Sequence, residues 1–362
     1  MPDNHAARRE KLRGVLAARD IPAALISSVV NVRYLTGFTG SNAALVVRAD
    51  GKPDVFATDG RYRDQAAAEC PDLEIVVDRN TVPALLERTV DSHLEKLAIE
   101  THVVTLDGLD LIRANRDWLE TPSLDRAVER LRAEKDDTEL DYVRTACAIS
   151  CRALDALLET PLVGRTEREI ARDLEQRMYD EGAEAIAFPT IVAAGENSAL
   201  PHHRANDRPV QVGDFLTIDF GARYAGYNAD CTRTVVVGAE PAGWQREIYE
   251  IVRAAQEAGR KALVPGTALS AVDAAARDLI TDAGYGEQFA HGLGHGIGLE
   301  VHEEPFFSKT AEGKLGARAS VTVEPGIYLP GRGGVRIEDT VIVNDGRLEL
   351  LTPTTKDLRV VY

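Results

Sequence analysis

The pattern of apolar and polar positions divides this chain into two parts near residue 130. In the first part, short apolar runs alternate with stretches of helical period, which is typical of a small α/β domain with a sheet of its own. The expected strands are 23–27, 43–48, 55–58, 73–77 and 96–99, and the expected helices are 61–68, 83–93 and 109–118.

The second part opens with a long amphipathic helix. A charged stretch, residues 128–137, is expected to connect the two parts, and Asp137 is expected to cap the helix. Apolar residues then recur at helical spacing: Leu140, Val143, Cys147, Leu154 and Leu158. We therefore expect an α+β protein with a small α/β N-terminal domain, residues 1–130, and a larger C-terminal domain, residues 131–362.

The larger domain contains a duplicated module of helix and hairpin. One expected helix closes at residues 180–182 and another at residues 282–284, and a glycine in each fits the left-handed position after the last turn. Another amphipathic helix, 244–263, is expected between the two copies. Two similar halves suggest a pseudo-twofold arrangement of the larger domain.

Each copy also places carboxylates at equivalent points. An apolar strand ends in Asp219 in the first copy and in Glu324 in the second. After a turn, a second carboxylate leads into valine-rich sequence, Asp230 in the first copy and Glu338 in the second.

The hairpin register follows from the expected turns. With Tyr224 and Ala225 in the first turn, Asp219 would lie directly opposite Asp230. A loop centred on Gly331 would likewise place Glu324 opposite Glu338. These acids could line solvated faces, but their flanks are apolar enough to bury the strands, and buried carboxylates are costly without a cation. The pattern therefore indicates a divalent metal site and a hydrolase.

Histidines complete the candidate site. His291 and His295 lie in a stretch with four glycines in eight residues, which argues against a helix, so we expect the backbone there to approach a metal or substrate closely. His302 follows in the second copy, and His202 occupies the corresponding place in the first. Each half thus brings a histidine towards one cleft.

Composition excludes several other classes of protein. The net charge of −16 disfavours a nucleic-acid partner. Four scattered cysteines are too few for a disulfide framework and favour a reducing, cytoplasmic compartment. Residues 1–20 do not form a secretory signal, and no apolar run is long enough to span a membrane.

The order Asp219, Asp230, His295, Glu324, Glu338 resembles the pita-bread metallopeptidases, which include methionine aminopeptidase, aminopeptidase P and prolidase. Residues 291–305, 323–328 and 334–339 resemble the proline-specific branch, and residues 34–41 and 58–62 resemble its additional creatinase-like N-terminal domain. The chain closely resembles short bacterial cytoplasmic Xaa-Pro peptidases over essentially its whole length. The resemblance implies a pita-bread fold for the larger domain.

The resemblance also implies a dinuclear metal centre. Asp219 would chelate one ion, His295 and Glu324 would hold the other, and Asp230 and Glu338 would bridge the two. Carboxylates with one imidazole suit Mn²⁺, with Zn²⁺ or Co²⁺ as substitutes. Two such ions can activate a water to attack the carbonyl before proline.

Further residues gain roles from the same resemblance. Glu324 would carry the proton of the water to the leaving nitrogen, and His202 and His302 would contact the substrate carbonyl and the developing oxyanion. Tyr328 and Arg336 would support the centre, with Arg336 orienting a bridging carboxylate. His291 would either bind near the proline ring or support His295.

Several functions stay open at this point. The expected activity is cleavage of Xaa-Pro dipeptides, and the alternative is an aminopeptidase P that acts on longer Xaa-Pro peptides. Creatinase-like C–N hydrolases and binding modules of the same fold would be expected to lack the full ligand set. A methionine aminopeptidase would usually dispense with residues 1–130.

The resemblance further implies a homodimer in which the N-terminal domain limits the length of the substrate. Arg33, Arg61 or Arg63 could then bind a substrate carboxylate from the neighbouring subunit, although each alone is better explained as an ordinary surface arginine.

Overall fold

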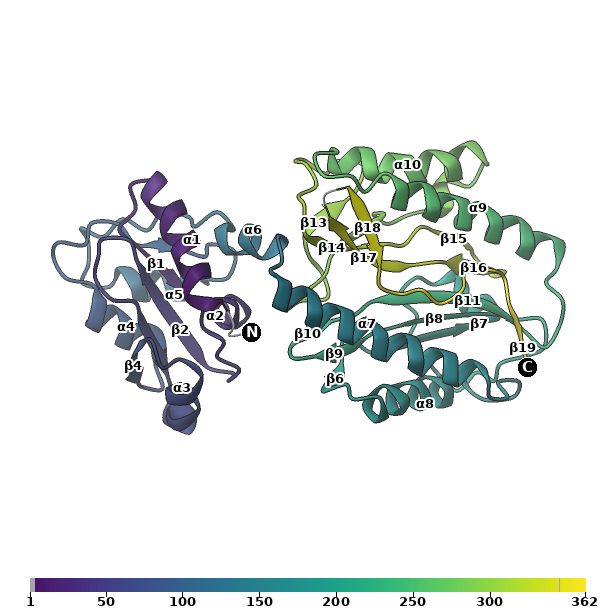
Figure 1. Ribbon diagram of the computed structural model, residues 1–362, viewed down its shortest axis with the longest axis horizontal. Coiled ribbons are helices and arrows are strands. Elements are labelled where there is room, and N and C mark those ends of the chain that lie inside the picture. The colour runs from purple at the N-terminus through teal and green to yellow at the C-terminus, as the bar shows by residue number, and fades with distance from the viewer. Residues whose placement is uncertain (1–3, 345) are drawn as a thin grey trace. The chain divides into compact units, whose positions relative to one another are not determined.

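The computed structural model describes residues 4–344 and 346–362, and the chain in it divides into two compact units. The first unit runs to Arg132, and the second runs from Ala133 to the C-terminus (Figure 1). Both units mix helices with sheets, which confirms the expected α+β class. A membrane-crossing helix is not found anywhere in the described ranges.

The first unit is built on one five-stranded sheet of order β4-β3-β2-β1-β5. Its strands are β1 Ala23–Ile26, β2 Ala43–Arg48, β3 Val55–Thr58, β4 Glu74–Val77 and β5 Ala98–Ile99. All five lie in the apolar runs expected to be strands. Every residue of β1, β2 and β3 is buried, which explains why these runs are continuously apolar rather than alternating.

In the described part of this unit, six α-helices and one short 3₁₀ turn accompany the sheet. They are α1 His5–Ala18, α2 Val29–Thr36, η1 Gly60–Tyr62, α3 Arg63–Glu69, α4 Thr81–Thr89, α5 Leu106–Arg113 and α6 Ala127–Ala133. The helix expected at 109–118 was misplaced, because the side chain of Thr105 caps the chain at Gly108 and starts α5 earlier. The stretch 128–137 was expected only to connect the two parts, but α6 covers its beginning.

Four long helices shape the second unit: α7 Asp137–Leu158, α8 Glu167–Asp180, α9 Gly243–Lys261 and α10 Leu269–Asp282. The N-cap of α7 is Asp136, one residue before the expected cap, because Asp136 and Glu139 form a reciprocal capping box. Gly182 and Gly284 have φ values of 103° and 89°, which confirms the left-handed positions expected after α8 and α10.

Short strands, antiparallel except for the parallel pair of β11 and β19, make up most of the rest of the second unit. The first copy of the module contains β6 Ala185–Ile186, β7 Ile191–Ala194, η2 Gly195–Ala199, β8 Phe215–Phe220, β9 Ala222–Tyr224, β10 Tyr227–Asn228 and β11 Cys231–Val237. The second copy contains η3 Gly286–Gln288, β12 Gly294–Gly296, β13 Glu303–Phe307, β14 Ala319–Val323, β15 Gly326–Leu329, β16 Gly333–Arg336, β17 Asp339–Asn344 and β18 Arg347–Leu350. The last strand, β19 Val360–Val361, pairs with β11 and so returns to the first copy.

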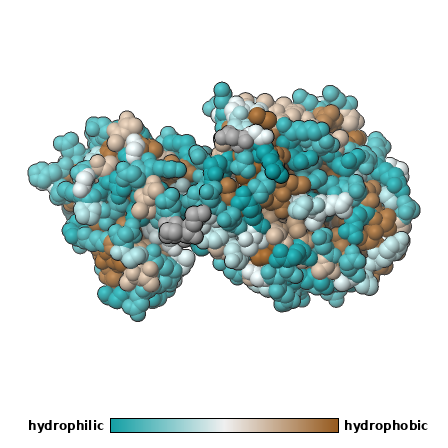
Figure 2. Space-filling model, in the orientation of Figure 1, coloured by the Kyte–Doolittle hydropathy of each residue, from teal (hydrophilic) through white to brown (hydrophobic). Residues whose placement is uncertain are grey.

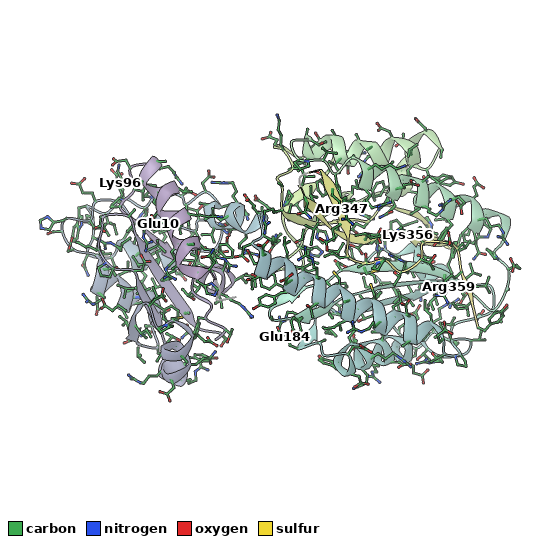
Figure 3. All side chains as sticks on the ribbon, viewed as in Figure 1. Glu10, Lys96, Glu184, Arg347, Lys356 and Arg359 are labelled. Atoms are coloured by element: carbon green, nitrogen blue, oxygen red, sulfur yellow. The ribbon has the colours of Figure 1, made fainter. Side chains whose placement is uncertain are left out.

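Each half of the second unit has its own apolar core. In the first half, α7 and α8 pack on the sheet β19-β11-β8-β7. In the second half, α9 and α10 pack on the sheet β13-β12-β14-β17-β18 (Figure 1). Hydrophilic residues cover much of the face seen in Figure 2. Charged side chains such as Glu184 and Arg347 are exposed on this unit (Figure 3).

Candidate metal centre

One cavity of the second unit gathers acidic and histidine side chains from both copies of the module. It has a volume of about 580 Å³, and its wall includes all five residues expected to bind metal: Asp219, Asp230, His295, Glu324 and Glu338. One potential ligand atom each from Asp219, Asp230 and Glu338 lie within 4.8 Å of one another. The same holds for His295, Glu324 and Glu338, and for Asp230, His295 and His302. Asp230, His295 and Glu338 therefore each belong to two of these three groups.

These side chains lie at the ends of paired strands. Asp219 is near the end of β8 and Asp230 immediately precedes β11. Glu324 immediately follows β14 and Glu338 immediately precedes β17. Because β8 pairs with β11 and β14 pairs with β17, each copy delivers two carboxylates to the same edge of its sheet.

The expected register of the first hairpin was wrong by two residues. Asp219 pairs with Thr232, and Asp230 lies two positions away from that pair. The turn is centred on Ala225 and Gly226, which both adopt positive φ, rather than on Tyr224 and Ala225. A shift of two residues keeps the side chains on the same face, so the two aspartates still converge as diagonal neighbours.

The expected register of the second hairpin agrees with its strand pairing. Val323 pairs with Asp339 on one side of the acidic pair, and Gly326 pairs with Arg336 on the other. Both pairs have residue numbers that sum to the same value as Glu324 and Glu338, so these two acids occupy opposed positions. The reversal centred on Gly331, with φ of 71°, therefore lies where the sequence placed it.

Burial makes this cluster unfavourable in the absence of a cation. Burial, together with the charges of neighbouring acids, raises the pKa of Asp230 and of Glu338 well above their ordinary values. Burial alone would also raise the pKa of Glu324, but the hydrogen bond and charge of His295 lower it to about 2. Nε2 of His295 lies 3.3 Å from Oε1 of Glu324 and 3.8 Å from Oδ2 of Asp230.

Three buried carboxylate oxygens have no hydrogen-bond partner among the described residues: Oδ1 of Asp219, Oδ1 of Asp230 and Oε1 of Glu338. Buried acceptors of this kind are normally satisfied, and an ion is one way to satisfy them. Carboxylates with one imidazole form a hard, oxygen-rich donor set that fits divalent ions. The residues present therefore fit the metal pair that the sequence implies.

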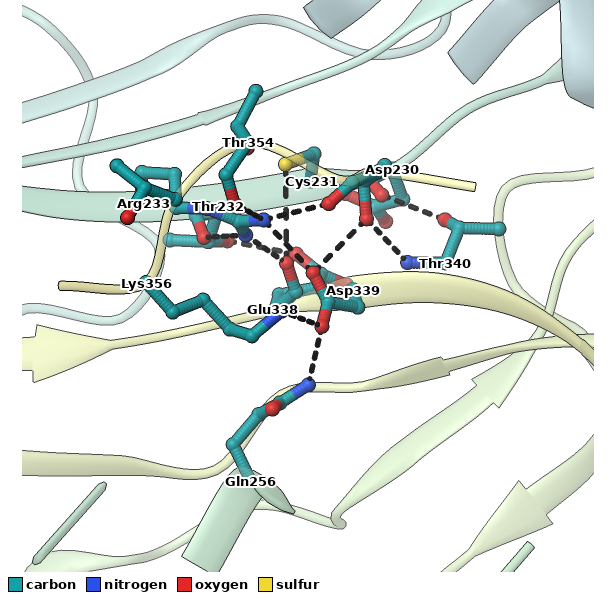
Figure 4. Close-up of polar contacts among 12 residues, drawn as sticks. Asp230, Cys231, Thr232, Arg233, Gln256, Glu338, Asp339, Thr340, Thr354 and Lys356 are labelled. Atoms are coloured by element: carbon teal, nitrogen blue, oxygen red, sulfur yellow. Dashed lines mark hydrogen bonds and ion pairs between the residues drawn. The ribbon is translucent and has the colours of Figure 1, made fainter. Parts of the chain in front are cut away.

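Other polar groups hold the carboxylates in place. Oγ1 of Thr232 donates to Oε2 of Glu338 over 2.7 Å, and Oγ1 of Thr340 donates to the main-chain oxygen of Asp230 over 2.7 Å (Figure 4). Behind them, Arg233 pairs with the buried Asp339 at 2.8 Å. These contacts were not predicted from the sequence, although each of these residues lies within three positions of Asp230 or Glu338, which was the available signal.

Arg336 contacts a different carboxylate from the one expected. Its Nη2 donates to Oδ2 of Asp219 over 2.6 Å, whereas we expected it to orient a bridging acid, Asp230 or Glu338. Its Nη1 donates to the hydroxyl of Tyr328 over 2.9 Å. Arg336 reaches Asp219 because it lies on β16, and β16 packs against β8 of the first copy.

The other predicted histidines line the same cavity. His202 and His302 are exposed at its wall, and the ring of His302 lies 4.4 Å from the ring of His295 in an edge-to-face contact. His291 also lines the cavity, and its Nε2 lies 2.9 Å from the hydroxyl of Tyr328. His291 thus contacts Tyr328, and it reaches the centre through Tyr328 and Arg336.

His203 is a further cavity residue that the sequence analysis did not select. Its Nε2 lies 2.7 Å from Oε2 of Glu167, the first residue of α8, whose side chain is fully buried. Glu167 also accepts from the backbone of Ala194 and the side chain of Asn197. The signal available in the sequence was the adjacent pair of histidines, of which only His202 was selected.

The glycines around His295 allow close packing of neighbouring strands. A Cβ atom on Gly294 would lie 2.2 Å from the main-chain oxygen of Thr322, and one on Gly296 would lie 2.2 Å from that of Glu304. These glycines therefore let β12 pass close to its neighbouring strands. Gly294 also lines the cavity, and its close approach to a metal or substrate stays a prediction. Arg61 of the first unit, one of the three arginines considered for a substrate carboxylate, forms an ion pair with Asp59 over 2.8 Å.

Comparisons with known proteins agree with this architecture. The model of "Metallopeptidase family M24" matches residues 141–345, and the model of "Creatinase/Prolidase N-terminal domain" matches residues 8–133. The Xaa-Pro dipeptidase of Pyrococcus furiosus is 36% identical, over 97% of this chain and 99% of that protein.

Two solved structures are similar over almost the whole chain. The Xaa-Pro dipeptidase from Bacillus anthracis is 37% identical with a TM-score of 0.93, covering 99% of this chain and 100% of that one. The X-Pro aminopeptidase from Thermotoga maritima is 38% identical with a TM-score of 0.89, covering 98% and 99%. These matches confirm the expected pita-bread fold behind a creatinase-type N-terminal domain. The chain therefore belongs to metallopeptidase family M24.

Proposed function

We propose that this metallopeptidase hydrolyses the peptide bond before proline in Xaa-Pro dipeptides. The observation that carries the proposal is the convergence of four carboxylates and His295 in one cavity, with three of the carboxylate oxygens buried and unpaired. The full-length similarity to proteins named Xaa-Pro dipeptidase supports the substrate class. Cleavage of longer Xaa-Pro peptides is the second candidate, because the similar Thermotoga maritima structure is named an X-Pro aminopeptidase.

We propose that Asp219, Asp230, His295, Glu324 and Glu338 hold two divalent ions. Asp219 would chelate one ion, His295 and Glu324 the other, and Asp230 and Glu338 would be shared. Glu338 shares one ligand group with Asp219 and Asp230 and another with His295 and Glu324, which supports its shared role. When bound, a metal pair supplies Lewis-acid character and a water of lowered pKa.

The protein's own groups then position the substrate and move the proton. Glu324 is proposed to accept the proton of the attacking water and deliver it to the leaving proline nitrogen. His202 and His302 lie on the cavity wall and are proposed to donate to the substrate carbonyl and the developing oxyanion. Arg336 holds Asp219 and, together with His291, holds Tyr328 beside the reacting groups.

An apolar wall of the same cavity suits a proline ring. Phe188, Pro189, Ile191, Val301 and Phe306 contribute to it. Proline carries no N–H on the bond to be cleaved, so that nitrogen cannot donate a hydrogen bond to the site, whereas its ring can pack on an apolar wall. The mixed character of the cavity therefore supports a substrate with one apolar, ring-shaped residue beside a polar reacting centre.

The identity of the metal, the oligomeric state and the cellular location are further proposals. Mn²⁺ is the proposed metal, with Zn²⁺ or Co²⁺ as substitutes, because carboxylates dominate the donor set. A homodimer and a cytoplasmic location are proposed from the resemblance to short bacterial Xaa-Pro peptidases. The four cysteines are free and buried, which supports a reducing compartment.

The decisive experiment assays metal-stripped protein with Mn²⁺, Zn²⁺ or Co²⁺ restored. The substrates are Xaa-Pro dipeptides, Xaa-Pro-Yaa-Zaa peptides and matched Xaa-Ala dipeptides. We expect Mn²⁺ to restore cleavage of Xaa-Pro, with little cleavage of Xaa-Ala. Faster cleavage of the tetrapeptides would favour the aminopeptidase, and failure to cleave either proline substrate with any metal would defeat the proposal.

A further inference from the structure

A buried ion pair lies outside the cavity but next to one of its histidines. Nζ of Lys135 lies 2.6 Å from Oε1 of Glu303, and the two side chains are only 1% and 4% exposed. Glu303 directly follows His302 in the chain. Neither Lys135 nor Glu303 lines the cavity. A fully buried charged pair of this kind is costly to form, so its place beside His302 calls for a functional reason.

Glu303 anchors the loop that carries His302. This loop, residues 297–302, joins β12 to β13, and Glu303 is the first residue of β13 and pairs with Gly296. Oε2 of Glu303 accepts from the backbone N–H of Glu300 over 3.2 Å. The carboxylate of Glu303 therefore links the loop to Lys135 through Oε1 and accepts a hydrogen bond from the backbone of the same loop through Oε2.

Lys135 is itself held firmly. Its N–H donates to the main-chain oxygen of Arg318 over 3.0 Å, and its main-chain oxygen accepts from Nε of Arg318 over 2.7 Å. It lies immediately before Asp136, the N-cap of α7. The ammonium group thus projects from a fixed point of the backbone to the base of the loop.

Gly298 leaves the space that the ion pair occupies. A Cβ atom at this position would lie 2.5 Å from Oε1 of Glu303 and 3.1 Å from Cε of Lys135. The main-chain oxygen of Gly298 accepts from both the backbone and the side chain of Asn228, each over 2.9 Å. The loop is therefore fixed from two sides, by Asn228 of the first copy and by Lys135.

We infer that Lys135 and Glu303 are positioning residues that set the placement of the His302 ring against His295. This inference rests on the proposed function, in which His302 donates to the reacting carbonyl. A displacement of His302 by about 1 Å would reduce turnover strongly, because catalytic donors act over narrow distances. Within the described part of the chain, Lys135 and Glu303 stay outside the cavity wall that carries the candidate ligands, so metal binding is expected to survive the loss of the pair.

A double-mutant cycle on turnover separates positioning from general stability. Lys135→Met is expected to lower kcat about tenfold or more, with KM changed far less. In a His302→Ala background, Lys135→Met is expected to have almost no further effect, because both changes remove the same interaction. Equal effects of Lys135→Met in the two backgrounds, or an unchanged kcat, would overturn the inference.

Further variants test whether a folding defect, rather than a displaced His302, lowers turnover. Lys135→Arg retains the charge and is expected to recover part of the loss. Lys135→Met combined with Glu303→Gln leaves no unpaired buried charge, so it is expected to fold like the parent and still turn over slowly. Recovery of the parent kcat in this double variant would contradict the inference. Arg144→Met is the matched control, because Arg144 of α7 pairs with Glu349 at 2.8 Å and neither residue lines the cavity.

A readout without turnover distinguishes this inference from the proposed function. All spectra are recorded without Mn²⁺. The imidazole signals of His302 in an NMR spectrum are expected to shift in Lys135→Met and to keep their parent positions in Arg144→Met. An inactive parent would defeat the proposed function, whereas unshifted His302 signals in Lys135→Met would defeat the positioning role.

Discussion

Nη2 of Arg336, in the second copy of the module, donates to Oδ2 of Asp219, in the first copy, over 2.6 Å. Arg336 also donates to Tyr328. We expect Arg336→Met to lower metal affinity and kcat about 10- to 100-fold, because it frees a candidate ligand, and Arg336→Lys to recover only part, because lysine lacks the planar fork.

Arg332→Met is the matched control for this prediction. Arg332 is exposed in the same hairpin and lies over the ring of Trp244 at 4.4 Å. Metal titration by calorimetry and steady-state kinetics provide the measurements. Equal effects of the two substitutions would show that the contact of Arg336 with Asp219 is not what matters.

Glu338→Ala is expected to remove most activity and part of the bound metal while the protein stays folded. Glu338 belongs to two of the three candidate ligand groups, so its loss is expected to weaken the binding of both ions. Metal content of the purified variant and its thermal unfolding check this. Glu312→Ala, at an exposed acid that does not line the cavity, is the control. An unchanged metal content in Glu338→Ala would rule out a shared role.

In the metal-free protein, the free energy of unfolding is expected to fall as the pH rises. The pKa of Asp230 and of Glu338 is raised by burial and neighbouring acids, so each binds its proton more tightly in the folded chain. Their contribution to stability is complete below their ordinary pKa of about 4 and is lost as the pH rises through the raised values. His295, whose pKa is raised by Glu324 against the effect of burial, acts in the same direction.

Thermal unfolding of metal-stripped protein between about pH 5 and about pH 8 tests this dependence. Glu324 acts in the opposite direction, but its pKa of about 2 confines that contribution to acid solution. Added Mn²⁺ is expected to restore stability most at the higher pH, because the ion replaces protons on the ligands. A metal-free protein that gains stability as the pH rises would contradict the assignment.

Gly294→Ala is expected to destabilise the protein by about 1–3 kcal/mol, because the added methyl group meets the backbone of β14. The nearest atom, the main-chain oxygen of Thr322, lies 2.2 Å from the ideal Cβ position. Gly316→Ala is the control, since a Cβ atom there meets nothing within 4 Å. Denaturant unfolding compares the two. Similar midpoints would mean that the close approach of the strands has little energetic consequence.

The four thiols are expected to resist labelling in the native protein. Burial raises the pKa of Cys70 and of Cys151 to about 11, and Cys147 and Cys231 are also buried. Incubation with a thiol reagent, followed by mass spectrometry, is expected to give no label before unfolding and four after it. Rapid labelling of any cysteine in the folded protein would show that its burial is not maintained.

Much of the fold follows from local patterns. The strands of the first unit and the helices α8 and α10 lie where apolar period and terminal glycines placed them, because burial on one face and the ends of helices leave marks in neighbouring residues. The errors occur where one side chain decides a boundary. Thr105 starts α5 early, and Asp136 rather than Asp137 caps α7.

The candidate ligands were also selected from the sequence alone, because duplicated carboxylates behind apolar strands have few other uses. The contacts that hold these ligands in place were not predicted from the sequence. Thr232 and Arg233 look like ordinary strand residues, and Glu167 looks like the first residue of a helix. Their role depends on partners more than thirty positions away, which no local pattern specifies.

The amino-acid sequence by itself determined which side chains can bind metal, their order in two copies and the family they indicate, since these depend on residue type and spacing. Only the tertiary structure decided the register at Asp219, the partner of Arg336 and the junction of Lys135 with Glu303. The physical reason is that a turn of one conformation rather than another, and the packing of two half-modules, determine which distant groups share a buried space.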